Sequence, residues 1–178
     1  MTAGGGAVST ADAAAREAAW LQASGDSLPA LLTAGYGPWD VVQAYWPGAH
    51  LAANQHGIYV DARTVADLRV SNQRIRPQYA FTLTLIWPVK AQGATAGSSG
   101  TARIAETEQQ NLDNAKDLII QRIRGPLGDK SHGGRFLSVA ENPRTVSYTK
   151  EDPSVTIPQN RSLRASLQYR ADDYEVSG

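Results

Sequence analysis

The residues best placed to do chemistry surround a histidine in the second half of the chain. His132 follows Asp129 within a polar, glycine-rich segment, and a histidine there could act as a general base or a metal ligand. The alternative is a polar turn residue packed against the end of a helix. We favour that alternative because no second ligand pair with metal-site spacing accompanies His132. His50 and His56 also lack a cysteine or carboxylate cluster in metal-ligand spacing, so we expect no metal there either.

A second segment that could bind a ligand is GPLGDKS at residues 125–131, which superficially resembles a phosphate-binding loop. It follows a predicted helix instead of a strand, and it lacks the glycine that directly precedes the lysine in such loops. The other glycine runs lack the strand and helix context of dinucleotide binding. We therefore expect no cofactor, no metal and no catalytic residue, and we expect that the protein is not an enzyme.

A third feature is a run of arginines between residues 63 and 76, which stands against two acidic residues, Asp61 and Asp67. The arginines are Arg63, Arg69, Arg74 and Arg76. They could contact phosphate, but a solvated edge ribbon or interchain salt bridges are the favoured interpretations. The chain has 17 basic and 17 acidic side chains, whereas a protein that grips nucleic acid by its phosphates usually has a basic surplus.

The amino-acid composition limits which other classes of protein this chain could belong to. The chain has 178 residues, 42% of them hydrophobic, which suits one domain over residues 10–178 after a flexible tail at 1–9. The absence of cysteine excludes disulfides, thiolate metal sites and cysteine nucleophiles. No apolar run approaches the roughly 20 residues that span a bilayer, and the N-terminus does not have the pattern of a signal peptide. We therefore expect no membrane association.

The N-terminal half predicts helices followed by strands. A helix is expected from Ser9 or Thr10 to Ala23, with an apolar stripe at Ala14, Ala18 and Leu21, and a shorter one between Ser27 and Gly35. β-branched and aromatic runs then predict strands at residues 39–46, 58–63 and 79–87. Residues 65–71 either extend the second of these strands or form a connecting ribbon. In the strand at 79–87, the alternating residues that share one face are Tyr79, Phe81, Leu83, Leu85 and Trp87.

The C-terminal half predicts one long helix and further strands. A flexible linker at 91–100 leads to a helix over residues 101–124, with an apolar stripe formed by Ile104, Leu112, Ala115, Ile119 and Ile123. A glycine-rich loop at 125–134 follows. Strands are expected at 136–140, 146–149 and 163–169, and a β-branched run at 155–157 ends at Pro158. The order indicates an α+β domain, with a mixed or mostly antiparallel sheet and helices on one face.

Several segments together resemble the tail-terminator proteins of siphophages that infect actinobacteria. The resemblance covers about residues 38–176, and its strongest strings are the Trp87-Pro88 pair at the end of a strand, HGGRFLSVAE at 132–141 and ADDYE at 171–175. The other segments that carry it are PWDVVQAYWPG (38–48), IYV (58–60), RVSNQRIRPQYAFTLTLIWPV (69–89), AETEQQNLDNAKDLIIQRIRG (105–125) and LRASLQYRADDYEV (163–176).

The resemblance implies a structural virion protein without catalytic residues. Such proteins form a hexameric ring at the head-proximal end of the tail tube, stop tube growth and join the tail to the head–tail connector. The implied partners are further copies of the chain, the tail tube protein and connector proteins, with genomic DNA passing through the ring without specific binding. Another head–tail connector, or a minor tail protein, is the alternative within the same class.

The candidate contacts for such an assembly are polar residues of the arginine run, the histidine segment and the C-terminal acidic pair. They are Arg63, Arg69, Arg74, Arg76, His132, Arg135, Asp172 and Asp173. Trp39, Trp46 and Trp87 lie at strand positions, where we expect core packing, although one of them could instead anchor a subunit interface. A small hydrolase or metal enzyme that uses His132 is the competing class.

Overall fold

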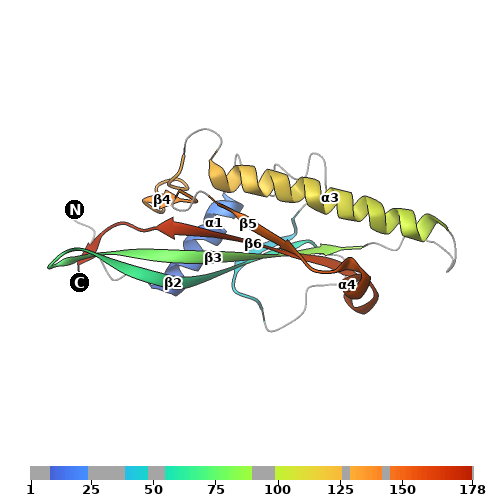
Figure 1. Cartoon of the computed structure of the whole chain (residues 1–178), viewed down its shortest axis with the longest axis horizontal. Helices are drawn as coiled ribbons and strands as arrows, with labels where there is room; N and C mark the ends of the chain where they lie inside the picture. The colour runs from blue at the N-terminus through green and yellow to red at the C-terminus, as the bar shows by residue number, and fades with distance from the viewer. Residues whose placement is uncertain are drawn as a thin grey trace.

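A long antiparallel β-hairpin forms the centre of the fold, and the other elements are arranged around it (Figure 1). The structure is a computed structural model and describes residues 9–23, 39–47, 55–89, 99–125, 129–141 and 145–177, the side chains of 99–104, 159–160 and 176–177 excepted. The hairpin strands are β2 (Gly57–Ser71) and β3 (Arg74–Pro88), each of 15 residues. β2 therefore includes the possible extension over 65–71, and β3 begins well before the expected strand at 79–87.

Five shorter strands extend this hairpin into one sheet. β6 (Ser162–Asp172) pairs antiparallel with β3, and β1 (Val41–Ala44) pairs parallel with β2 at the other side. The strand order is β1-β2-β3-β6-β4, while β5 pairs with β6 and β7 pairs with β3. The last three strands are β4 (Ser138–Val139), β5 (Ser147–Lys150) and β7 (Val176–Ser177). The mixed, mostly antiparallel sheet of an α+β fold is confirmed.

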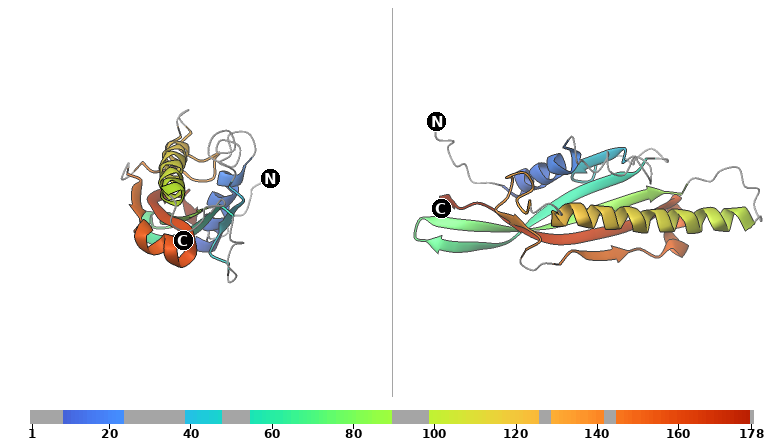
Figure 2. Two further views of the ribbon diagram at one scale, coloured as in Figure 1. Left: turned by 90° about the vertical axis from the view of Figure 1, so that its right-hand side faces the viewer. Right: turned by 90° about the horizontal axis from the view of Figure 1, so that it is seen from above.

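Two helices cover one face of this curled sheet, and the core lies between them and the strands (Figure 2). They are α1 (Thr10–Gln22), which Ser9 caps, and α3 (Ser99–Arg124). The alternating residues of β3, from Tyr79 to Trp87, are at most 1% exposed. The alternating residues of the neighbouring strand β6, from Leu163 to Ala171, are at most 3% exposed. The helical stripes are buried against them at Ala14, Ala18, Leu21, Leu112, Ala115, Ile119 and Ile123. The predicted alternation and both stripes are therefore confirmed, apart from Ile104, whose side chain lies outside the described residues.

A short helix replaces the β-branched run at 155–157. This helix, α4 (Pro153–Asn160), begins where the Asp152 carboxylate accepts a hydrogen bond from the backbone N–H of Ser154, and it has a proline at its start. Both features favour a helix N-terminus, and here they override the β propensity of Val155 and Ile157. The expected strand at 136–140 is also reduced to the two residues of β4, because Phe136 belongs to the preceding turn.

Several expectations fall on segments outside the described residues. These are most of the N-terminal tail, the short helix between Ser27 and Gly35, and residues 91–98 of the linker. The structure begins the long helix at Ser99, so the last two residues of the expected linker belong to α3. Of the glycine-rich loop at 125–134, Gly125 and the part from Asp129 onward are described, and hydrogen bonds hold residues 129–134 in a compact turn.

Gly125 ends α3 in a conformation that only glycine adopts without cost. Its φ is +63°, and a Cβ at this position would overlap the main-chain oxygen of Asp129. We expect Gly125→Ala to lower the free energy of unfolding by roughly 2–4 kcal/mol, since the overlap adds to a left-handed backbone cost of about 1–2 kcal/mol. Gly134→Ala is the matched control, because Gly134 has a φ of +75° but open space around it. Urea unfolding should separate the two variants, and equal losses would contradict this account.

Candidate functional site

His132 lies at the centre of a buried polar network that joins four parts of the fold. Its imidazole is 0% exposed. Nδ1 lies 2.9 Å from Glu17 Oε2 on α1, and Nε2 lies 2.9 Å from the carbonyl oxygen of Ile123 near the end of α3. Tyr169 on β6 donates its hydroxyl to Glu17 Oε1 at 2.5 Å. Glu17 is also 0% exposed, so both carboxylate oxygens obtain their hydrogen bonds from within the protein.

The geometry of this network fixes where its protons must be. A carbonyl oxygen can only accept, so Nε2 of His132 carries a hydrogen and donates it to Ile123. Nδ1 and Glu17 then share a single proton, either as an imidazolium beside a carboxylate or as a neutral pair. Both arrangements have no net charge, which is the condition under which burial of such groups is tolerated.

Aromatic stacking holds the imidazole in place from one side. The rings of Trp20 and His132 are stacked, with centroids 3.4 Å apart and planes 8° from parallel. The guanidinium of Arg122 lies 4.3 Å from the centre of the Trp20 ring. His132 is therefore sealed from solvent, and no substrate reaches its imidazole in this conformation.

Asp129 does not form a catalytic pair with His132. Its carboxylate accepts hydrogen bonds from the backbone N–H and hydroxyl of Ser131 and from the backbone N–H of Gly133. The hydrogen bond from the Ser131 hydroxyl, followed by the backbone bond from Gly133, lowers the pKa of Asp129. The carboxylate therefore shapes the turn that presents His132 to the core. The favoured interpretation of His132, a polar turn residue packed against a helix end, matches this geometry.

Three tyrosines with raised pKa values make the free energy of unfolding fall at alkaline pH. Burial, followed by the charge of Glu17, raises the pKa of Tyr169, and burial raises the pKa of Tyr79 to about 12. Burial, with the charge of Asp113, also raises the pKa of Tyr148. Each neutral phenol contributes stability that is fully present below pH 10 and is lost as the pH rises from the unfolded value through the folded one. Urea unfolding should show a falling free energy above pH 10, and a constant value there would exclude this linkage.

The two C-terminal aspartates lie against the core as well. Asp173 is 1% exposed and forms an ion pair of 2.5 Å with Arg16 of α1. Asp172 is half-buried and accepts a hydrogen bond from Gln78. The Arg16 guanidinium also donates to the carbonyl oxygen of Arg135. As buried residues, His132 and Asp173 have no surface to offer an assembly partner in this conformation, and they position α1 against the sheet.

The arginine run lies on the outer half of the central hairpin. Arg74 and Arg76 form ion pairs with Glu175, while Arg69 donates to the Ser71 carbonyl and to Asn72. Arg63 lines a polar hollow with Gln168 and Arg170 on the sheet face opposite the helices. Arg135 is half-buried and donates to the His132 carbonyl. The structure thus brings Arg74 and Arg76 together but does not gather the candidates into one site.

This outer half of the hairpin, residues 65–76, is termed the arm. It extends past the helices at one end of the molecule (Figures 1 and 2). Its β2 side is exposed almost throughout, and the large apolar side chains Val65, Leu68 and Val70 are 39%, 47% and 46% exposed. Two register shifts, near Val65 and Val70, interrupt the ladder of the arm. The arm therefore presents apolar surface that the described part of the monomer does not cover.

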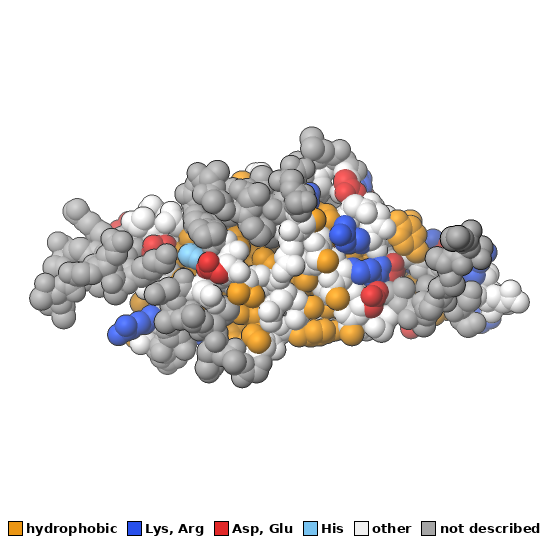
Figure 3. All heavy atoms as spheres, turned by 180° about the vertical axis from the view of Figure 1, so that it is seen from behind, with side chains coloured by type: hydrophobic (Ala, Val, Ile, Leu, Met, Phe, Trp, Pro, Cys, Tyr) orange, Lys and Arg blue, Asp and Glu red, His pale blue; other side chains and the backbone are white. Residues whose placement is uncertain are grey.

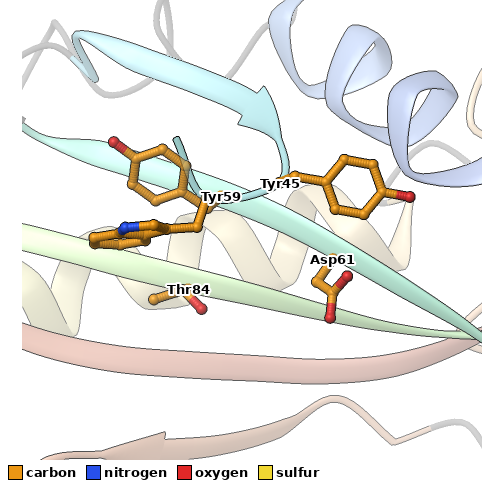
Figure 4. A pocket seen from close by; sticks show the side chains of 5 residues that line it. Tyr45, Tyr59, Asp61 and Thr84 are labelled. Carbon is orange, nitrogen blue, oxygen red and sulfur yellow. The ribbon is translucent and has the colours of Figure 1, made fainter. Parts of the chain in front are cut away.

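A second exposed apolar area lies at the end of β1. Tyr45 has a left-handed φ of 61°, which turns the chain away from the strand and leaves Tyr45 41% and Trp46 45% exposed. With Tyr59, Asp61 and Thr84 these residues line a pocket of about 410 Å³, termed the aromatic pocket. Tyr59 and Thr84 lie at one end of it and Tyr45 and Asp61 at the other (Figure 4). Trp39 and Trp87 are buried as expected, whereas Trp46 is not.

On the face in Figure 3, few Lys and Arg side chains are visible, and those near the middle of the face lie beside Asp and Glu side chains. Within the described residues, no group of three or more potential metal ligands occurs, and none of the helices is long and apolar enough to cross a bilayer.

Comparison with known proteins gives no match: no protein-family model, no curated protein and no solved structure is similar to this chain.

Sequence reasoning missed Glu17 and the exposure of Tyr45 and Trp46. A signal for Glu17 exists, because it falls between Ala14 and Leu21 on the same helical stripe, and a carboxylate on a buried face requires internal partners. No comparable signal marks Trp46, since its exposure follows from the turn at Tyr45.

Proposed function

We propose that this protein is a structural, ring-forming component of the virion of a long-tailed bacteriophage. In this proposal it acts as a tail terminator, which closes the head-proximal end of the tail tube, stops its growth and joins the tail to the connector. The sequence resemblance over residues 38–176 supports this role.

The observation that carries the proposal is the arm. Three large apolar side chains, Val65, Leu68 and Val70, are exposed on a two-stranded ribbon that reaches beyond the helices. Such ribbons are marginally stable alone in water, and clustered apolar surface of this kind marks protein–protein contacts. A protein that exposes an arm at one end and receives it elsewhere forms head-to-tail contacts, which close into a ring when the rotation permits.

The proposed partners follow from this role. Copies of the chain form the ring, which we propose to be a hexamer, and its two faces contact the tail tube protein and a connector protein. Genomic DNA passes through without specific binding, in keeping with a net charge of zero. The protein is assembled in the host cytoplasm and resides in the tail of the virion.

A tube polymerisation assay tests the role. Tail tube protein of the phage that encodes this chain would be polymerised with and without it, and tube lengths would be measured by electron microscopy. We expect shorter tubes with a ring of extra density at one end. Tubes of unchanged length without such density would rule out the terminator role.

A further inference from the structure

Two arginines lie in one row across the three central strands of the sheet. Arg63 on β2 is the register partner of Ala80 on β3, and Ala80 is in turn the partner of Arg170 on β6. Neighbouring strands lie about 4.8 Å apart, so roughly 10 Å separates the Cα atoms of the two arginines. The residues that precede them, Ala62 and Tyr169, are buried in the core. Because side chains alternate between the two faces of a sheet, both arginines project from the face opposite the helices.

The charges of these two arginines are not compensated within the part of the chain that the structure describes. Arg63 and Arg170 form no ion pair and no side-chain hydrogen bond with the described residues. Asp61 and Asp172 lie two residues away along the same strands, but Asp61 lines the aromatic pocket and the Asp172 carboxylate accepts a hydrogen bond from Gln78. Two unpaired cations on one area of the surface create a positive potential that attracts an anion.

The two arginines line a hollow of about 210 Å³, termed the arginine hollow, whose other polar side chains can all donate hydrogen bonds. These donors are the hydroxyls of Thr145 and Ser147 and the side-chain amide of Gln168. Ala80 also lines the hollow, and its small side chain leaves space between the two guanidiniums. No carboxylate belongs to the described lining. Hydrogen-bond donors combined with two positive charges suit an anion that has several acceptor oxygens.

We propose that the arginine hollow binds a phosphate oxyanion, which is either free inorganic phosphate or the terminal phosphate of a phosphomonoester. A phosphomonoester carries roughly −1.5 to −2 charge at pH 7, which matches the two guanidiniums. Each planar guanidinium can donate two parallel hydrogen bonds to phosphate oxygens, and the hydroxyl and amide side chains can donate to the remaining ones. This binding site is independent of the proposed role in a ring.

Equilibrium dialysis against labelled inorganic phosphate tests the site on the full-length protein, whatever its oligomeric state. The ionic strength is held constant with chloride, because salt screens exposed charges. We expect binding to saturate at a single phosphate per chain. Arg63→Gln and Arg170→Gln should each weaken binding by about tenfold, since each removes one charge-assisted interaction, and the double variant should abolish it.

Arg124→Gln is the matched control for these variants. Arg124 is also exposed and has no ion pair in the described part of the chain, but it lies in the last turn of α3. Its variant should bind phosphate like the parent protein. Equal weakening in Arg124→Gln, unchanged binding in the double variant, or binding that does not saturate would each overturn the proposal, because each indicates a non-specific association.

Ala80→Glu supplies an independent readout of the same site. A glutamate at this position would place a carboxylate between the two arginines and compete with the phosphate for both. The side chain of Ala80 lies outside the core, so the variant should fold, and it should lose phosphate binding. Binding that is unchanged in Ala80→Glu would place the phosphate elsewhere and would overturn the proposal.

Competition distinguishes the possible sources of the phosphate. If a small phosphomonoester displaces the label as well as unlabelled phosphate does, the site takes the terminal phosphate of a larger ligand, and weaker displacement assigns the site to the free ion. Short duplex DNA should compete poorly, since each of its phosphodiesters carries one charge. If DNA instead displaces the label more effectively per phosphate group, the two arginines belong to a nucleic-acid surface and the proposal is wrong.

Discussion

Replacement of Glu17 by alanine should lower the free energy of unfolding by roughly 3–5 kcal/mol, because it breaks a fully buried ionisable pair. The carboxylate has two partners at hydrogen-bond distance, His132 and Tyr169, and all three side chains are at most 3% exposed. Without Glu17, the imidazole Nδ1 and the phenol hydroxyl lose their hydrogen-bond partner in a buried site. Chemical unfolding monitored by circular dichroism would measure the loss.

Glu17→Gln is the matched control for this prediction. The amide oxygen can accept from Tyr169, and the amide NH₂ can donate to Nδ1 of a neutral His132 that keeps its Nε2 hydrogen on Ile123. We therefore expect a loss of only about 1 kcal/mol, in line with the exchange of one hydrogen bond for a weaker one. Comparable losses in both variants would mean that the charge, and not the hydrogen-bond geometry, maintains the network.

Aspartate at two positions of the arm, Leu68→Asp with Val70→Asp, should weaken self-association by about a hundredfold, or roughly 3 kcal/mol. Both side chains are nearly half exposed in the monomer, and in the proposed assembly they become covered when the arm docks. The melting temperature of the monomer should change little, since the substitutions touch no core residue. Sedimentation velocity over a concentration series would give the association constant.

Val155→Asp controls for the added charge. Val155 is 48% exposed, close to the 47% of Leu68, but it lies on α4, outside the arm and the aromatic pocket. Its variant should assemble like the parent protein. If Val155→Asp weakens association as much as the arm variant does, general charge repulsion and not arm docking controls assembly.

The layered fold could be predicted from the sequence because its signals are periodic. The alternation from Tyr79 to Trp87 and the helical stripe of α3 each report directly which side chains face the core. A strand that leaves the core has no such signal. Residues 65–71 contain β-branched residues like the rest of β2, and only the structure shows that they project beyond the helices.

The helical stripe of α1 indicates that Glu17 is buried, but the partners of Glu17 could not be predicted, because they are distant along the chain. Glu17 and His132 are 115 residues apart, and Glu17 and Tyr169 are 152 apart. Each partner looks ordinary in its own segment, since one is a histidine in a polar loop and the other is a tyrosine in a strand. The aromatic pocket is similar, since it depends on a turn at Tyr45 and on the register between β1 and β2.

The measurement that tests the central claim most directly is the native mass of the purified full-length protein across a concentration series, with electron microscopy of the same sample. Head-to-tail association through the arm predicts a closed ring of 19.1 kDa subunits, a hexamer by the proposed function, whose mass stops increasing with concentration. A protein that stays monomeric at high concentration, or that stops at a symmetric dimer, would contradict the claim.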